Sequence, residues 1–110
     1  MIDAPSNRQD KVANFIKEQS ASVLAKIDNK SSLITVTGAD ISPDLKRATL
    51  FITVLPEAKE AQALGFVERN LGEIRDHLKK NMATKIIPYL EVKIDLGEKN
   101  RQKIDQLLKE

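Results

Sequence analysis

The 110-residue sequence predicts an α+β domain in which helices cover one face of a three-stranded sheet. Apolar residues recur at helical spacing in two long segments, at about 7–26 and 57–84. Three shorter runs are rich in β-branched residues or alternate apolar with polar residues, as strands do. No internal repeat or Gly/Ser linker divides the chain, so we expect a single domain over 1–110 with an ordered core of about 7–108.

The first helix is predicted over 7–26. Its apolar residues share one helical stripe: Val12, Ile16, Val23 and Ile27. Ser6 or Asn7 can cap this helix, because a short polar side chain accepts a hydrogen bond from a free amide of the first turn. The residues at 28–32 have turn composition and end the helix.

Two strands follow, at 33–37 and 48–55. The second strand alternates, so that one row faces inward (Leu50, Ile52, Val54) and one outward (Thr49, Phe51, Thr53). The residues Ser-Pro-Asp at 42–44 have turn chemistry, since proline presets φ and Asp can bond its own backbone. We therefore expect an antiparallel pair, with one sheet face left open by the helices.

The helical pattern at 57–84 is interrupted by Gly65 and Gly72. A glycine inside a helix costs about 1 kcal/mol relative to alanine. Sharp bends concentrate where glycine relaxes the backbone. The segment therefore predicts two helices with a kink near Gly72.

The C-terminal segment predicts a strand and a short helix. Pro88 disfavours helix at the preceding residue, and 89–95 alternates with Leu90, Val92 and Ile94 on the inward side. Gly97 is expected to end this strand. Asn100 can cap a last helix over 101–109, whose apolar face is Ile104, Leu107 and Leu108.

Composition excludes most catalytic and metal-binding sites. With 41% hydrophobic and 31% charged residues the chain is globular, and the absence of cysteine removes disulfides and thiolate ligands. His77 is the only histidine and is expected on the solvent side of its helix. No nucleophile–base constellation, P-loop or dinucleotide motif is present. We expect no enzymatic activity, no metal and no cofactor.

Positive charge is concentrated in the C-terminal third of the chain. The net charge is only +2, but 69–103 holds nine Lys and Arg against five Asp and Glu, an excess of four. Such an asymmetry suits an anionic partner, although a solvated helix face is the commoner explanation of a charge run.

Gly72 lies off the apolar stripe and next to basic residues. If the helix is interrupted there, the second half begins with free amides and a partial positive charge, which can bind a phosphate. The missing side chain would let the nucleic-acid backbone approach. The neighbouring cations are Arg69, Arg75, Lys79, Lys80 and Lys85. Packing of Gly72 against the sheet is the structural alternative.

Two further basic pairs are secondary candidates for phosphate contacts. Arg8 and Lys11 begin the first helix, and Lys46 and Arg47 precede the second strand. Plain solvation is the alternative for both pairs. Aromatic residues are scarce, at 4%, and base-by-base reading of single strands usually depends on stacking. Their scarcity favours recognition of a structured RNA surface by shape and charge.

The order α-β-β-α-α-β matches the type II KH arrangement of RNA-binding domains. Four segments make the match more specific than the order of elements alone: TVTGADISPDL at 35–45, ATLFITVL at 48–55, GEIRDHL at 72–78 and KIIPYL at 85–90. In this order and spacing they resemble the ribosome-binding factor A family. The resemblance covers about 7–108.

The resemblance implies a small cytoplasmic bacterial protein that binds the small (30S) ribosomal subunit and its ribosomal RNA and assists late rRNA maturation without catalysis. In that family an A-x-G kink replaces the G-x-x-G loop of KH domains. Here the position reads Asn70-Leu71-Gly72, so Asn70 joins the candidate RNA-binding residues. We expect no membrane partner and a monomer in the free state. The loops at 28–32 and 96–101 depart from the family pattern.

An alternative function is a protein-interaction adaptor outside the ribosome. Its basis is the mixed outward face of the sheet around Phe51, which a partner protein could cover. Pull-down that survives RNase and high salt would favour the adaptor over the RNA-binding factor.

Overall fold

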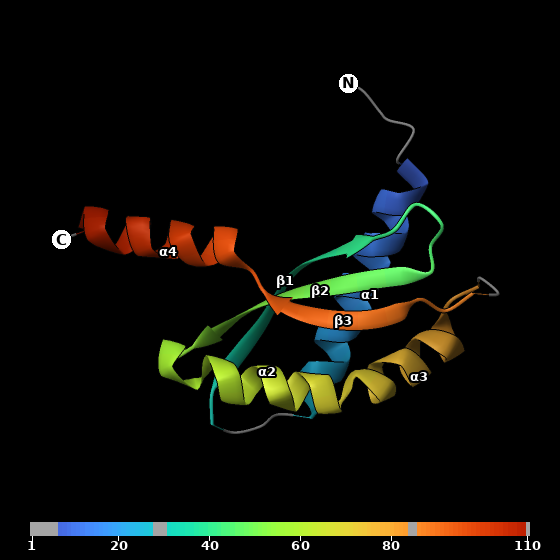
Figure 1. Cartoon of the computed structure of the whole chain (residues 1–110), viewed down its shortest axis with the longest axis horizontal. Coiled ribbons are helices and arrows are strands. Elements are labelled where there is room, and N and C mark those ends of the chain that lie inside the picture. The colour runs from blue at the N-terminus through green and yellow to red at the C-terminus, as the bar shows by residue number, and fades with distance from the viewer. Residues whose placement is uncertain (1–6, 28–30, 84–85, 110) are drawn as a thin grey trace.

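The computed structural model describes residues 7–27, 31–83 and 86–109. Its elements are α1 (Asn7–Lys26), β1 (Leu33–Ile41), β2 (Arg47–Leu55), the 3-10 helix η1 (Glu57–Lys59), α2 (Glu60–Arg69), α3 (Leu71–Asn81), β3 (Tyr89–Ile94) and α4 (Leu96–Lys109) (Figure 1). The α+β class and the order of helices and strands are those predicted. The first helix has the predicted bounds.

The three strands form one sheet in the order β1-β2-β3. β1 and β2 are antiparallel, as predicted, with Leu33 opposite Leu55 and Val36 opposite Ile52. A register shift follows Val36, and β1 then continues to Ile41, four residues beyond its predicted end. Gly, Ala and Asp are poor strand formers, so pairing with β2 overrides local propensity there. β3 lies parallel to β2.

The connection between β1 and β2 is the turn predicted at 42–44. The Ser42 hydroxyl donates to Asp44 Oδ1 at 2.6 Å, and the Arg47 amide donates to Ser42 Oγ at 3.0 Å. Leu45 has a φ of 63°, an uncommon conformation for a residue other than glycine. The side chains of Ser42 and Asp44 thus hold the connection closed around Leu45.

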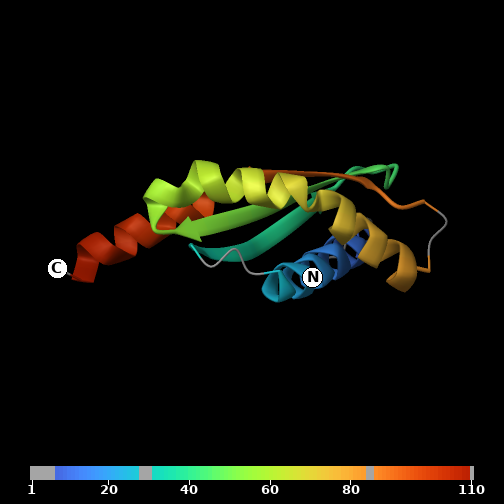
Figure 2. The same cartoon turned by 90° about the horizontal axis from the view of Figure 1, so that it is seen from below.

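One face of the sheet is covered by α1, α2 and α3 (Figures 1 and 2). The inward row of β2 is buried: Ala48, Leu50, Ile52 and Val54. It meets Ile16 of α1, Val67 of α2, and Ile74 and Leu78 of α3, all fully buried. Each such side chain contributes about 1.5–3 kcal/mol by leaving water. The apolar spacing of the sequence therefore identified the residues that fix α3 on the sheet.

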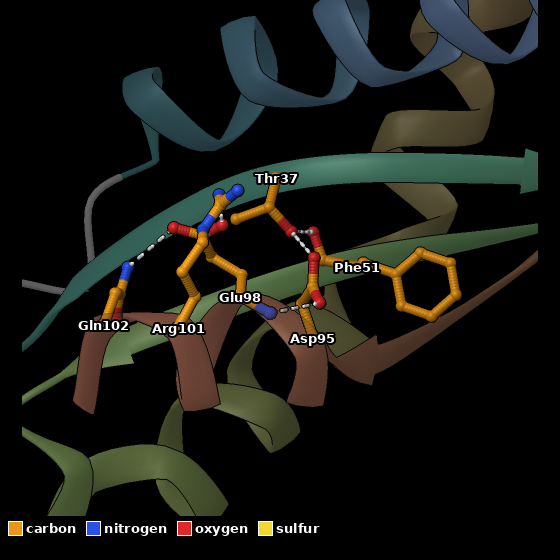
Figure 3. A network of polar contacts seen from close by, with 6 residues as sticks. All are labelled: Thr37, Phe51, Asp95, Glu98, Arg101 and Gln102. Atoms are coloured by element: carbon orange, nitrogen blue, oxygen red, sulfur yellow. Dashed lines mark hydrogen bonds and ion pairs between the residues drawn. The ribbon is translucent and has the colours of Figure 1, made fainter. Parts of the chain in front are cut away.

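The last helix begins five residues earlier than predicted. Asp95, and not Asn100, caps it, since Asp95 Oδ1 accepts a hydrogen bond from the Glu98 amide at 3.0 Å. Gly97 lies inside α4 instead of ending the strand. The second carboxylate oxygen of Asp95 accepts a hydrogen bond from the Thr37 hydroxyl of β1 (Figure 3). This double use of Asp95 could not be read from local sequence, because Thr37 is distant in the chain.

Helix α4 lies away from α1 and α3 (Figure 1). Its first turns lie beside Thr53, a residue of the outward row of β2 that is only 8% exposed. The helix then leaves the body of the molecule (Figure 1). Ile104, Leu107 and Leu108, predicted as its apolar face, are exposed. None of the helices in the described ranges is long and apolar enough to cross a membrane.

Replacing Asp95 by alanine removes both the cap of α4 and the bond to Thr37. We expect the free energy of unfolding to fall by about 1–2 kcal/mol, the usual cost of losing an N-cap. Urea denaturation followed by circular dichroism measures it. Asp105→Ala, at an exposed position of the same helix, is the control and should change stability by less than about 0.5 kcal/mol. Equal effects of the two changes would contradict this role of Asp95.

Candidate nucleic-acid interface

Helices α2 and α3 meet at Asn70. This residue has φ −105° and ψ 6°, outside helical values, and its amide donates to the Val67 carbonyl at 2.9 Å. The helix axis changes direction there (Figures 1 and 2). The interruption predicted near Gly72 is thus present, but it lies two residues earlier, and Gly72 is the second residue of α3.

The side chain of Asn70 stabilises the end of α2. Its Nδ2 donates to the Phe66 carbonyl at 2.8 Å. Carbonyls in the last turn of a helix have no intrahelical donor, so this bond supplies one. Asn70, predicted as an RNA-binding residue, therefore has a structural contact that an alanine at this position would lack.

Gly72 is exposed, and neither its conformation nor its surroundings require glycine. Its φ is not positive, and a Cβ added there would meet no heavy atom within 4 Å. Packing against the sheet, the structural alternative, is thereby excluded. The first backbone bond of α3 runs from the Ile74 amide to the Asn70 carbonyl at 3.1 Å, so the amides of Gly72 and Glu73 have no intrahelical acceptor.

Arg75 points back into the protein. Its Nη2 donates to the Ile87 carbonyl at 3.1 Å and its Nε to the Pro88 carbonyl at 3.3 Å. The guanidinium thus ties α3 to the segment that enters β3. Replacing Arg75 would disturb this segment as well as any phosphate contact, so Arg75 is a poor position for a test of binding alone.

Lys79 and Lys80 are exposed near the end of α3. Within the described ranges, no carboxylate forms an ion pair with either of them. Arg69 is exposed at the end of α2, and its Nη1 lies 3.4 Å from where a Gly65 Cβ would stand. Lys85 lies outside the described residues.

The secondary candidates gather at the end of the molecule where α3 ends. Arg8 and Lys11 at the start of α1 are exposed, as are Lys46 and Arg47 beside the β1–β2 connection. Arg8 lines one cavity together with Asp44 and Met82, which shows that α1, the connection and the end of α3 adjoin. The structure therefore brings both basic pairs to the end of the molecule that also carries Lys79 and Lys80 (Figure 1).

Three of the nine cations counted at 69–103 lie on α4 and form ion pairs, so they are not part of the basic surface on α3. Lys99 Nζ lies 2.8 Å from Glu57 and 2.9 Å from Glu60, Lys103 lies 3.7 Å from Glu57, and Arg101 pairs with Glu98 (Figure 3 shows the last pair). The hydrogen bond from Lys99 and the charge of Lys103 lower the pKa of Glu57, and the bonds to Glu57 and Glu60 raise the pKa of Lys99. These three cations of α4 are thus paired with carboxylates, and they lie at the opposite end of the molecule from the last turn of α3.

The helical position of His77 predicted a side chain on the solvent side, and this prediction is wrong. His77 is half-buried, and its Nε2 lies 2.6 Å from Gln19 Oε1 of α1. The pair joins α3 to α1 and is a structural contact. Among the described residues no group of three His, Cys, Asp or Glu side chains could hold a metal ion.

Comparison with known proteins identifies the family. The family profile described as ribosome-binding factor A matches residues 8–108. The chain belongs to the ribosome-binding factor A family. A ribosome-binding factor A of Geobacter metallireducens is 36% identical over 107 residues, covering 94% of this chain and 90% of that protein. One of Thermodesulfovibrio yellowstonii is 35% identical over 108 residues, covering 96% and 92%.

Solved structures of ribosome-binding factor A share the fold. The crystal structure of the Thermus thermophilus protein superimposes with a TM-score of 0.71 at 18% identity, covering 78% of this chain and 93% of that one. A homology model of a Thermus thermophilus ribosome binding factor A, fitted into a cryo-EM map of a 30S complex, gives 0.64 at 20% identity, covering 74% and 88%. At this identity the likeness establishes the fold.

Substituting Gly72 by alanine should stabilise the protein. The site accepts a Cβ without contact and has an ordinary φ, so the change reduces only the freedom of the unfolded chain. We expect the free energy of unfolding to rise by about 0.5–1 kcal/mol, measured by urea denaturation. A loss of stability would show that Gly72 is needed for packing after all.

Substituting Asn70 by alanine should lower the free energy of unfolding by about 1 kcal/mol, because the Phe66 carbonyl loses its donor. Asn81→Ala is the matched control. Asn81 Nδ2 makes the same type of bond, to the His77 carbonyl at 2.8 Å, but at an exposed position where water can replace it. Thermal denaturation of both variants gives the comparison, and a larger effect at Asn81 would refute the assigned role of Asn70.

Proposed function

We propose that this protein binds the small ribosomal subunit and its ribosomal RNA and assists late maturation of that RNA. Membership of the ribosome-binding factor A family supports the ribosomal partner. One member of the same fold has been fitted as part of a 30S complex. The proposed contact surface runs from Gly72 along α3 to Lys79 and Lys80.

The observation that carries this proposal is the exposed glycine of α3. Gly72 costs helix stability, and the structure offers no internal reason for it. A bare backbone at the start of a helix admits a phosphate, and the lysines about two turns further on can continue the contact along the RNA backbone. Arg8, Lys11, Lys46 and Arg47 extend the same basic end, and Arg69 flanks the junction.

The proposal includes no catalytic step and no cofactor. Binding and release of an RNA surface need only charge, shape and the exposed backbone described above. We place the protein in the cytoplasm with the ribosome and propose that it is a monomer when free. The adaptor alternative requires a partner on the outward sheet face around Phe51, part of which is occupied by the first turns of α4.

Replacing Lys79 and Lys80 by alanine tests the surface. Both are exposed and without ion-pair partners among the described residues, so the fold should be unchanged. We expect affinity for purified small subunits to fall about tenfold or more. The slope of log affinity against log salt should decrease by about 1 for each phosphate that the variant no longer binds.

The matched control is Lys26→Ala with Lys93→Ala, which also removes two positive charges, from exposed positions on α1 and β3. It should leave the affinity within about twofold of the native value. Equal weakening in both variants would mean that net charge, and not this surface, determines binding. Unchanged affinity in the Lys79/Lys80 variant would reject the surface.

A further inference from the structure

A continuous apolar groove lies between the start of α1 and the end of α3. Two adjoining cavities, of about 330 and 310 Å³, share Val12, Met82 and Ala83 in their walls. Phe15 of α1 lines one end of the groove, and Leu45, at the β1–β2 connection, lines the other. We call this feature the α1–α3 groove. It lies at the opposite end of α3 from Asn70 and Gly72.

The groove exists because α3 stops at Met82. That residue has φ −94° and ψ 139°, an extended conformation, while its amide still donates to the Leu78 carbonyl at 2.8 Å. The chain therefore turns away from the helix and leaves the side of α1 at Val12 and Phe15 partly uncovered. Ala83, the next residue, is exposed and small, so nothing of its own side chain fills the space.

The rim of the groove is basic. Arg8 borders one cavity and Lys11 the other, and both are exposed. The acid at the rim is Asp44, whose Oδ1 already accepts bonds from the Ser42 hydroxyl at 2.6 Å and the Lys46 amide at 3.0 Å. Among the described residues, the rim of this apolar slot thus carries two cations and one carboxylate that is already hydrogen-bonded within its own turn.

We propose that the α1–α3 groove receives an unpaired nucleobase of the bound RNA, with Arg8 and Lys11 holding the phosphates on either side of it. An unstacked base is an apolar, flat group carried on an anionic backbone, which matches an apolar slot with an aromatic wall and a cationic rim. The inference rests on the proposed function, which supplies the RNA partner. It adds a second contact, made with a base and not with the sugar-phosphate backbone of the RNA. An apolar side chain of a small-subunit protein is the competing occupant.

Met82 provides a direct probe of the groove, because the chain has only two methionines. The full-length protein is labelled with ¹³C at the methionine methyl groups, and the Met82 signal is assigned with Met82→Leu. The ligands are the hexanucleotides r(A)₆ and r(U)₆ and a blunt-ended RNA duplex that has no unpaired base. A base in the groove shifts the Met82 methyl signal, most strongly through the ring current of adenine, so the hexanucleotides should shift it and the duplex should not.

Ala83→Trp fills the groove from an exposed position without removing a core side chain. We expect it to abolish the Met82 shift and to weaken hexanucleotide binding about tenfold, the scale of a single base–aromatic stack. Ala58→Trp, on an exposed residue of η1 at the far end of α2, is the control and should behave as native. Arg8→Ala with Lys11→Ala should weaken binding and lower its salt dependence, while the Met82 shift at saturation persists.

The outcomes separate this inference from the proposed function. If the native protein binds small subunits but no hexanucleotide moves Met82, the groove proposal is overturned and the ribosomal function stands. If hexanucleotides move Met82 but small subunits do not bind, the groove stands and the ribosomal function falls. A Met82 shift caused by RNA-free small-subunit proteins, and not by RNA, would assign the groove to a protein side chain and overturn the proposal.

Discussion

The break between α2 and α3 at Asn70 is the constraint on which the rest of the structure depends. Both helices bury an apolar stripe against the same sheet, α2 through Ala63 and Val67 and α3 through Ile74 and Leu78. Sheets twist, so one straight helix could not keep both stripes on the sheet along its whole length. The change of axis lets α2 follow β2 and β3 while α3 reaches α1. The bond from Asn70 to the Phe66 carbonyl offsets part of the cost of stopping α2 in mid-segment.

The same break creates the exposed start of α3. Amides that have no acceptor within α3, and an exposed glycine, then occur at the change of direction. The lysines further along α3 are left without carboxylate partners in the described structure. At the other end of the molecule the charges of α4 are paired with Glu57, Glu60 and Glu98. A chain with a net charge of only +2 thereby presents one basic end. Such an arrangement suits contact with an anionic surface without a strongly basic composition.

Local sequence predicted most of the fold because the apolar periods are regular. The stripe of α1 and the alternation of β2 and β3 each identified buried residues, for instance Ile16, Leu50 and Val92. What it missed depends on partners far away in the chain. The true start of α4 follows from Asp95 bonding both Glu98 and Thr37, and the extension of β1 to Ile41 follows from pairing with β2.

The candidate site could be predicted only in part, because several of its side chains contact residues that are distant in the chain. The exposure of Lys79 and Lys80 follows from the helical period, whereas the inward course of Arg75 depends on carbonyls at Ile87 and Pro88 that no helical pattern reveals. Similarly, His77 was placed on the wrong side because Gln19 of α1 could not be foreseen beside it. The neutralisation of Lys99 by Glu57 and Glu60 is also a tertiary contact, which a count of charges along the chain cannot show.

Hydrogen exchange of the protein free and bound to small subunits tests the central claim most directly, because it maps the contact surface without any substitution. We expect slower amide exchange at 71–83, greatest at Gly72 and Glu73, and at the start of α1, with α4 unchanged. Protection confined to the outward sheet face around Phe51 and to α4, with α3 exchanging as in the free protein, would contradict it.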